Sequence, residues 1–305
     1  MKFLLITLFS FCTISCASAQ DGINLKFSNS DRSIGGQCVE APFIPDSISF
    51  AGEMVPLNDE DVRIALSNEI LITKYMHSKT MRSLLDSRRY FAVIEPILKE
   101  NGIPDDFKYL AVAESSLDPN AYSYAKAAGL WQILAATGTQ YKLEVGSTVD
   151  ERYHVEKSTI AACKYLTTAY NKFGSWTMAA ASYNVGMAGL ARRAESQKES
   201  KFFDLILPTE TMRYVFRILT YKILCEYPEN LGYYVGDDDY YPPFRYREIT
   251  VKTSSINWVN LAKEHGTTYK KLKTLNPWIR EYTHSNKYGK SYTVRVPIAY
   301  GSVLD

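Results

Sequence analysis

Cysteine and histidine are scarce in this sequence, which has five cysteines and four histidines in 305 residues. Beyond the apolar N-terminal segment only Cys38, Cys163 and Cys225 remain, and an odd number cannot pair fully within one chain. We interpret Cys163 and Cys225, which lie among apolar neighbours in predicted helices, as small buried hydrophobes. No histidines are spaced as His-x-x-x-His or His-x-His, so we expect neither a metal site nor any cofactor.

Long hydrophobic runs and basic runs with interleaved aromatics are also missing. The apolar stretch Phe3–Ile14 is too short to span a bilayer, and no later stretch is long enough. The net charge of +2 argues against a bulk polyelectrolyte partner, and no basic run with interleaved aromatics suggests nucleic acid. The composition, 46% hydrophobic and 22% charged, suits a folded main domain plus a smaller one.

The first 19 residues have the pattern of an export signal peptide. Lys2 provides the positive start, an apolar core follows, and Ala17–Ala19 is a small-residue cleavage site. A second processing site competes, because Thr13–Cys16 loosely resembles a bacterial lipobox with Thr where Leu is usual. Lipidation at Cys16 would attach the protein to a membrane, whereas cleavage after Ala19, which we favour, would release it. Both routes predict a protein of the bacterial periplasm or cell envelope.

Composition and periodicity divide the rest of the chain into a flexible leader (20–50), a helical main domain (51–228), a linker (229–243) and a small module (244–300). Apolar spacing predicts helices at Asp59–Met76, Ser78–Asn101, a segment ending near Ser116, Ser158–Phe173, Trp176–Tyr183 and Thr209–Cys225. The module shows a different alternation of apolar and polar residues. Its predicted elements, in order, are a strand (Tyr246–Val251), two helices (258–265 and 268–275) and a second strand (Tyr292–Val296). We therefore expect a mainly α protein that ends in a small α+β module.

One carboxylate stands out in the predicted helix that ends near Ser116. Phe107, Leu110, Ala111 and Glu114 fall at i, i+3, i+4 and i+7, so they share one helix face that is otherwise apolar. Desolvation and the negative end of the helix dipole both disfavour the ionised form of Glu114 and raise its pKa. A carboxyl group that keeps its proton near neutral pH is a candidate general acid.

Four motifs in order, the first of which contains Glu114, carry a family resemblance. They are Glu114-Ser115 with Asp118-Pro119, then residues 128–132 (AGLWQ), 182–186 (SYNVG), and 207–211 (LPTET) with Tyr214-Val215. The set resembles the lytic transglycosylases that share the goose-type lysozyme fold, most closely their membrane-bound type D branch. That family usually has Met before the Gln of the second motif, and Trp131 is typical of the type D branch. The resemblance runs from about Val55 to the helix after Pro208 and implies a lysozyme-like helical catalytic domain.

The C-terminal module resembles a LysM peptidoglycan-binding module of βααβ order. Leu272-x-x-Leu275-Asn276 fits this pattern, but Lys252–Ser255 replaces the usual Gly-Asp-Thr after the first strand. The module is therefore a degenerate LysM, and a structural appendage packed on the catalytic domain is the alternative. As a LysM it would add affinity for the wall without taking part in the chemistry.

The resemblance implies a peptidoglycan lytic transglycosylase. Such an enzyme cleaves the β-1,4 bond between N-acetylmuramic acid and N-acetylglucosamine without water and leaves 1,6-anhydromuramic ends. Glu114 would act first as general acid and then as base on the C6 hydroxyl of the muramic ring. The residues that match the family's substrate-binding positions are Ser115, Gln132, Tyr183, Asn184 and Tyr214. The expected partner is the glycan strand of peptidoglycan.

Two other functions compete with this interpretation. A goose-type lysozyme would hydrolyse the same bond with water, but it would need a second carboxylate across the cleft. The matching motifs show none, and we interpret Glu210 as a structural residue at a helix start and Asp118, Asp150 and Glu151 as turn and cap groups. A non-catalytic wall-binding protein is the other alternative, and retention of Glu114, Gln132 and Tyr214 argues against it.

Overall fold

The computed structural model describes residues 40–298. The predicted signal peptide (1–19), with the competing sites at Cys16 and Ala19, lies outside the described residues, as does Cys38. Residues 41–298 belong to one compact unit. Within residues 40–298 no helix is long and apolar enough to cross a membrane.

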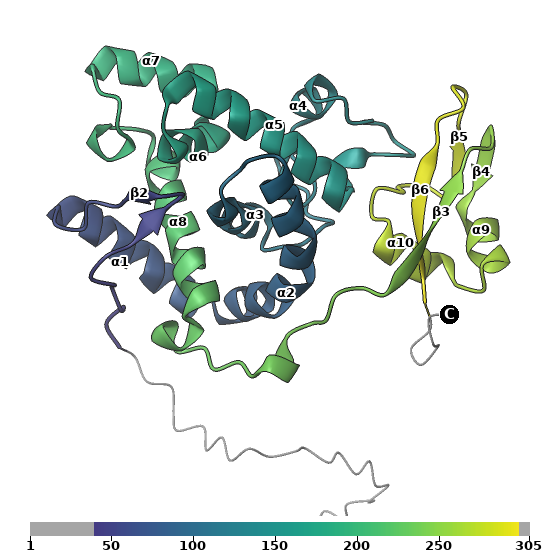
Figure 1. Ribbon diagram of the computed structural model, residues 1–305, viewed down its shortest axis with the longest axis horizontal. Helices are drawn as coiled ribbons and strands as arrows, with labels where there is room; N and C mark the ends of the chain where they lie inside the picture. The colour runs from purple at the N-terminus through teal and green to yellow at the C-terminus, as the bar shows by residue number, and fades with distance from the viewer. Residues whose placement is uncertain (1–39, 299–305) are drawn as a thin grey trace, which may run out of the picture. The chain divides into compact units, whose positions relative to one another are not determined.

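The main domain is built almost entirely of helices (Figure 1), which confirms the predicted mainly α fold. Its α-helices are α1 (Glu60–Tyr75), α2 (His77–Glu100), α3 (Lys108–Ser115), α4 (Ala135–Gln140), α5 (Val155–Phe173), α6 (Trp176–Val185), α7 (Met187–Gln197) and α8 (Thr209–Glu226). Short 3₁₀ turns are η1 (Asp105–Phe107), η2 (Glu151–Tyr153), η3 (Phe202–Asp204), η4 (Pro228–Leu231) and η5 (Asp237–Asp239). Every helix predicted from apolar spacing is present, whereas α4 and α7 were not predicted.

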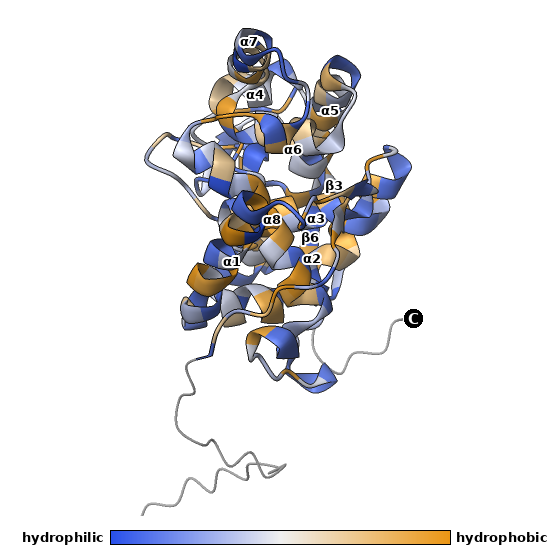
Figure 2. Cartoon of the chain, turned by 90° about the vertical axis from the view of Figure 1, so that its left-hand side faces the viewer, coloured by the Kyte–Doolittle hydropathy of each residue, from blue (hydrophilic) through white to orange (hydrophobic). Residues whose placement is uncertain are grey.

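The short helix α3 packs between α2 and α8, and α8 also packs against α1 and α6. The interior face of α3 is fully buried, because Phe107, Leu110 and Ala111 have no exposed surface. Figure 2 shows apolar and hydrophilic stretches alternating along the helices, as expected for amphipathic helices around a shared core. Cys163 is buried and Cys225 half-buried, and both are free thiols, in agreement with their interpretation as apolar packing residues.

A small β-hairpin that precedes α1 is hydrogen bonded to the start of α6, which lies far from it in the sequence. Strands β1 (Ser49–Phe50) and β2 (Glu53–Met54) pair antiparallel, and Ile48 and Phe50 are buried in the main core. The leader predicted over 20–50 therefore overlaps the folded domain at its end. The Glu53 carboxylate accepts hydrogen bonds from Trp176 N (2.5 Å) and Thr177 N (3.0 Å), which are the first amides of α6. An anion at a helix N-terminus is stabilising, so the hairpin fixes the start of α6.

The predicted linker (229–243) packs against α2. The backbone amide of Tyr241 donates to Leu85 O (2.9 Å), and the Arg88 guanidinium lies 3.9 Å from the ring centre of Tyr240. The Arg89 guanidinium in turn lies 4.4 Å from the ring centre of Phe244. Backbone hydrogen bonding and cation–π contacts therefore fix the path of the chain into the module.

The module has the predicted strand, helix, helix, strand order with one additional pair of strands (Figure 1). Its elements are β3 (Tyr246–Val251), β4 (Ser255–Asn257), α9 (Trp258–Glu264), α10 (Tyr269–Leu275), β5 (Thr283–Ser285) and β6 (Tyr292–Pro297). β3 pairs antiparallel with β6, and the additional strands β4 and β5 pair with each other. Trp258, Leu272, Ile279 and Val294 are fully buried and form the centre of a separate small core.

A loop of the main domain completes this small core. Val149 forms an antiparallel bridge with Ile279, and the amide of Asp150 donates to Trp278 O (3.0 Å). Val149 and Tyr153 are buried in the same apolar cluster as the module's own residues. The module is therefore joined to the main domain by shared backbone hydrogen bonds and a shared core.

Candidate active site

A cavity of about 420 Å³ opens in the main domain at the end of α3. Of the six site residues predicted from the sequence, five line it: Glu114, Gln132, Tyr183, Asn184 and Tyr214. They come from α3, the loop before α4, the end of α6 and the middle of α8. The fold therefore gathers residues separated by up to a hundred positions around one space.

Glu114 lies in the last turn of α3, just before the chain leaves the helix at Ser116 in the left-handed region (φ 55°). Burial of the carboxyl raises its pKa to about 7, as expected from its place on an apolar helix face. A hydrogen bond from Tyr214 and the charge of Arg217 act in the opposite direction and lower the pKa. Glu114 can therefore hold or release a proton near neutral pH.

Tyr214 comes from the neighbouring helix α8 and is only 2% exposed. Its hydroxyl donates a hydrogen bond to Oε1 of Glu114. Burial, together with the neighbouring Glu114 charge, raises the pKa of the Tyr214 phenol well above its ordinary value, so it remains a donor. The hydrogen bond orients the carboxyl and stabilises its ionised form.

Gln132 lies in the loop before α4 with φ of 45°, a strained conformation for a residue other than glycine. Its Nε2 donates to Gly129 O (2.8 Å) and to Ala121 O (3.3 Å). Because both partners are carbonyl oxygens, the two amide hydrogens are used within the loop. The side chain therefore offers its Oε1 to the cavity as an acceptor, instead of both donor and acceptor.

Gly129 and Arg152 shape the loop that carries Gln132. Gly129 has φ of 77°, and a Cβ there would lie 2.1 Å from Arg152 O, so no other residue fits without movement. The Arg152 guanidinium donates to Lys126 O (2.9 Å) and Ile133 O (3.2 Å) and pairs with Asp150 (2.6 Å). This buried pair, which the sequence did not reveal, ties down both ends of the loop.

Tyr183 and Asn184 stand at the end of α6, as the sequence predicted. The Tyr183 hydroxyl donates to Trp131 O (2.9 Å), which leaves its oxygen as an acceptor toward the cavity. The Asn184 Oδ1 accepts from Thr211 Oγ1 (2.8 Å), which directs the other amide atom away from that contact. Tyr183 therefore presents an acceptor, and Asn184 keeps its amide donor for a ligand.

Ser115 is the predicted site residue that the structure does not bring into the cavity. Its Oγ donates to Ala111 O (3.1 Å), one turn back along α3. A serine near a helix end commonly satisfies its hydroxyl in this way. A role in orienting substrate is therefore unsupported for Ser115, and its neighbour Glu114 alone faces the cavity.

Glu210 lies in the first turn of α8, the helix start inferred from the sequence, and together with Arg217 it also lines the cavity. The Arg217 Nη1 donates to Glu210 Oε1 (3.0 Å), and its Nε lies 3.7 Å from Glu69 Oε2. Glu210, Tyr214 and Arg217 fall at i, i+4 and i+7 of α8, a spacing that shares one helix face. That spacing in the sequence is the signal that could have found the second carboxylate.

Comparison with known proteins agrees with this geometry. Residues 91–206 match the family model described as the transglycosylase SLT domain. Residues 247–299 match the soluble lytic transglycosylase C-terminal LysM-like domain. The chain carries an SLT domain and a LysM-like domain. Glu114, Gln132, Tyr183 and Asn184 lie inside the SLT match, and α8 adds the remaining cavity residues from just beyond it.

Individual proteins are also similar to this chain. The chain is 28% identical over 280 residues to membrane-bound lytic murein transglycosylase D of Escherichia coli (strain K12), which covers 88% of this chain. It spans 60% of the length of that relative. Among solved structures, the 70 kDa soluble lytic transglycosylase of Escherichia coli is 20% identical, with a TM-score of 0.42 over 60% of this chain and 32% of that chain. Lytic transglycosylase Slt of Pseudomonas aeruginosa gives a TM-score of 0.39 at 20% identity, over 50% of this chain and 26% of that one.

Proposed function

We propose that this protein is a peptidoglycan lytic transglycosylase with Glu114 as its catalytic acid and base. The observation that carries the proposal is the half-buried Glu114 carboxyl, with a pKa of about 7, hydrogen bonded to Tyr214 in a cavity of an SLT domain. A group that titrates near the working pH can give a proton in one step and take one in the next. The similarity to membrane-bound lytic murein transglycosylase D of Escherichia coli supports this substrate.

The reaction begins with protonation of the glycosidic oxygen. Glu114 gives its proton to the oxygen that links C1 of the muramic sugar to the next sugar, and the C1–O bond breaks. The positive charge at C1 is stabilised by the substrate's own N-acetyl group. The Glu114 carboxylate, stabilised by the Tyr214 hydroxyl, then accepts the proton of the C6 hydroxyl while that oxygen bonds to C1. Atoms balance without water, and the ring closure gains from proximity within one sugar.

The other cavity residues are assigned to substrate binding. Gln132 Oε1 and the Tyr183 hydroxyl oxygen are acceptors, so they suit the N–H and O–H groups of the sugars. Asn184 keeps an amide donor, which suits the carbonyl of an N-acetyl group. Tyr214 is assigned to positioning Glu114. Ser115 is not included, because its hydroxyl is bonded within α3.

Hydrolysis by a lysozyme-like route is the second candidate, and Glu210 is the observation that favours it. A second carboxylate in the cavity could activate water on the opposite side of the sugar. Glu210, however, is paired with Arg217 at 3.0 Å, and its side chain is mostly exposed. Because the Arg217 guanidinium already occupies the Glu210 carboxylate, we favour the route through Glu114 alone.

The test is release of soluble muropeptides from purified sacculi by the full chain and by Glu114→Gln. Gln keeps the shape and accepts the Tyr214 hydrogen bond but carries no proton to give. We expect a rate loss on the order of 10²–10⁴-fold. Glu195→Gln, an exposed carboxylate on α7, is the matched control and should retain full activity. Near wild-type release by Glu114→Gln would overturn the assignment.

The substrate implies export, in agreement with the predicted signal peptide (1–19). The mass of the mature protein from a bacterial envelope fraction decides between the two processing sites. Cleavage after Ala19 leaves Gln20 as the unmodified first residue, whereas lipidation leaves Cys16 first and adds the mass of acyl chains. We favour the unmodified form, because Thr13 departs from the usual lipobox.

A further inference from the structure

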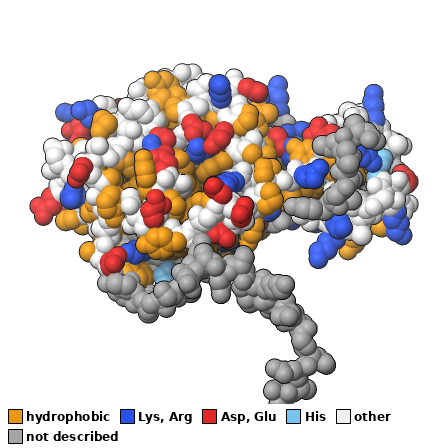
Figure 3. All heavy atoms as spheres, turned by 60° about the horizontal axis from the view of Figure 1, so that its bottom comes forward, with side chains coloured by type: hydrophobic (Ala, Val, Ile, Leu, Met, Phe, Trp, Pro, Cys, Tyr) orange, Lys and Arg blue, Asp and Glu red, His pale blue; other side chains and the backbone are white. Residues whose placement is uncertain are grey.

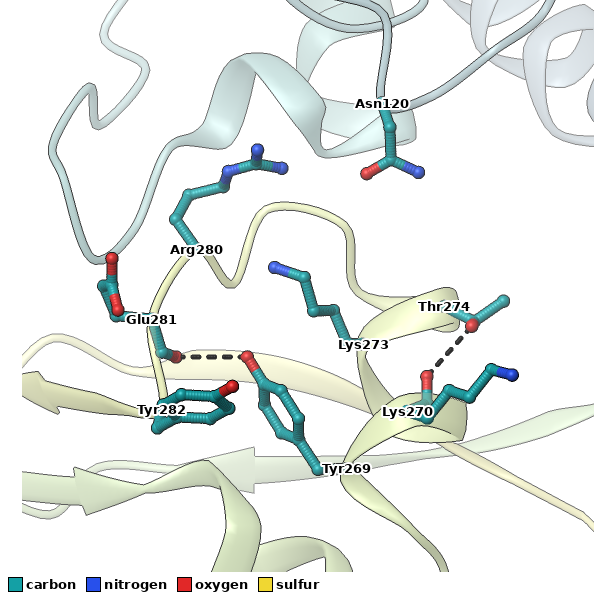
Figure 4. Close-up of a pocket in the computed structure, with 8 residues that line it drawn as sticks. All are labelled: Asn120, Tyr269, Lys270, Lys273, Thr274, Arg280, Glu281 and Tyr282. Atoms are coloured by element: carbon teal, nitrogen blue, oxygen red, sulfur yellow. Dashed lines mark hydrogen bonds between the residues drawn. The ribbon is translucent and has the colours of Figure 1, made fainter.

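A second cavity, of about 500 Å³, lies beside α10 of the module. Six of the residues around it carry the argument, and Figure 4 shows them with their neighbours: Asn120, Tyr269, Lys270, Lys273, Arg280 and Tyr282. The side chains of Lys273, Arg280 and Asn120 point toward one space (Figure 4). Asn120 is the contribution of the SLT domain.

The cavity concentrates positive charge that has no acidic partner. Among residues 40–298, none of Lys270, Lys273 and Arg280 forms an ion pair within 4.0 Å of a carboxylate. Glu281 is the one acid of the lining, and in Figure 4 its carboxylate lies on the far side of Arg280 from Lys273. Burial and the charge of Arg280 both lower the pKa of Lys273. An anion in this space would relieve that repulsion.

The cations are held in place before any ligand arrives. Lys273 Nζ donates to Ile279 O (2.5 Å), and Arg280 Nη1 donates to Pro277 O (3.0 Å). The Arg280 guanidinium also lies 3.9 Å from the ring centre of Tyr153, in the SLT domain. Each group keeps further N–H donors for a carboxylate, and fixed donors lose less entropy on binding.

Aromatic rings line the same cavity. The rings of Tyr269 and Tyr282 lie 5.0 Å apart, and Tyr282 is 63% exposed. The exposed Tyr282 ring offers an apolar face for a sugar ring, and the half-buried Tyr269 ring beside it is fixed by a hydrogen bond from its hydroxyl to Glu281 O (3.4 Å). Fixed cations beside these rings suit a saccharide that carries carboxylates.

One loop connects this cavity with the candidate active site. Asn120 lines the second cavity, and Ser123 and Ala127 of the same loop line the first. Between them Tyr122 is 58% exposed and Tyr124 is fully exposed. A strand leaving the active site along this loop would meet aromatic side chains before it reaches the module.

The module as a whole has the charge for such a ligand. Eleven of the 35 Lys and Arg residues lie in 244–298, against three of the 33 Asp and Glu residues. Figure 3 shows Lys and Arg side chains spread over one face of the module. The near-neutral total of +2 hides this asymmetry, which draws anionic ligands toward the module.

We propose that this second cavity binds the stem-peptide carboxylates of the same peptidoglycan strand that the active site cleaves. Lys270, Lys273 and Arg280 would bind the carboxylates, and Tyr269 and Tyr282 would pack against the sugars. The site would thus select strands that still carry peptides. This inference rests on the proposed function for the identity of the strand, whereas its recognition chemistry rests on the residues of the second cavity.

Binding measured in the full chain with Glu114→Gln, which cannot cleave its ligand, tests the proposal. The probe is a soluble peptide-bearing glycan strand, compared with the same strand after removal of its peptides. We expect Lys270→Gln with Lys273→Gln to weaken binding of the peptide-bearing strand roughly tenfold. The stripped strand should bind weakly to both proteins. Lys263→Gln with Lys271→Gln removes the same charge from exposed positions outside the cavity and should change little.

Three outcomes would overturn the site. They are equal binding of both strands, equal effects of the two double variants, and equally tight binding of a short oligonucleotide of the same charge. Failure of the proposed function has a different signature. Sacculi would then resist the wild-type chain, while charge-dependent binding of the peptide-bearing strand persists.

Discussion

The Tyr214 hydroxyl on α8 donates its hydrogen bond to the carboxyl of Glu114 at the end of α3. Burial raises the pKa of Glu114, and this hydrogen bond limits the rise, so that the pKa settles at about 7. The packing of α3 against α8 therefore sets both the position and the acidity of the proposed catalytic group.

Tyr214→Phe should raise the pKa of Glu114 further, because the ionised carboxyl loses a donor while burial remains. The alkaline limb of the kcat/KM profile should move up by about one to two pH units, since a hydrogen bond to a charged group is worth roughly 1.5–3 kcal/mol. At its optimum the variant should be slower, because the carboxylate formed after proton transfer is less stable. An unchanged limb in the pH–rate profile would show that Tyr214 does not tune Glu114.

Glu210→Gln should shift the same limb in the opposite direction. The negative charge of Glu210 raises the pKa of Glu114 and the positive charge of Arg217 lowers it. Removing the carboxylate takes away one negative charge near Glu114 and leaves Arg217 beside Glu69, so the limb should move to lower pH. The shift should stay under about one unit and shrink in high salt, because the pair is partly exposed. The products should be unchanged, and loss of all activity at every pH would instead indicate a catalytic role for Glu210.

Glu114→Gln should stabilise the folded protein at alkaline pH. A carboxyl whose pKa is raised on folding binds more protons in the folded state, so stability falls as pH rises from about 4.5 to about 7. Gln has no such dependence. In urea unfolding the variant should match the wild type near pH 4 and exceed it at pH 8 by up to about 3 kcal/mol. Parallel stability–pH curves would mean that burial does not perturb Glu114.

Ending the chain after Pro243 should damage the SLT domain as well as wall binding. The truncation exposes Val149 and Tyr153 and removes the hydrogen bond between Asp150 and Trp278. Asp150 pairs with Arg152, which holds the loop of Gln132. We therefore expect a lower melting temperature and slower cleavage of soluble strands.

The sequence suggested that the module binds the wall and has no influence on the chemistry. The expected effect of the truncation on cleavage differs from that interpretation. The Lys270→Gln, Lys273→Gln variant keeps the shared core, so its melting temperature should stay at the wild-type value. A truncated chain with unchanged melting temperature and cleavage would restore the simpler view.

Periodicity in the sequence was sufficient for the amphipathic helices, because each buries a regular apolar stripe. It missed α7, of which only Leu190 is buried, since a mostly polar helix leaves no such stripe. Glu114 could be predicted because it is a carboxylate on an otherwise apolar helix face. The same apolar surroundings make it reactive. Arg152 was not, because its partners are backbone carbonyls of an irregular loop, and backbone positions leave no pattern in the residue types.

The motifs alone did not predict that Ser115 lies outside the cavity lining and that Glu210 lies within it, and helix geometry explains both. Ser115 follows Glu114 directly, so it points to a different side of α3 and bonds to Ala111 O. Glu210 precedes Tyr214 by one turn of α8, which brings it to the cavity. The contact between Val149 and Ile279 joins distant segments through backbone pairing, which apolar spacing alone does not specify.

The most direct test of the central claim is the chemistry of the new chain end. Sacculi digested by the wild-type chain in heavy-oxygen water should release muropeptides with unlabelled 1,6-anhydro ends, one water lighter than reducing ends and resistant to borohydride. This follows because the C6 oxygen, not a solvent oxygen, bonds to C1 when Glu114 acts alone. Reducible ends that carry heavy oxygen would contradict the account, establish hydrolysis, and assign activation of the water to Glu210.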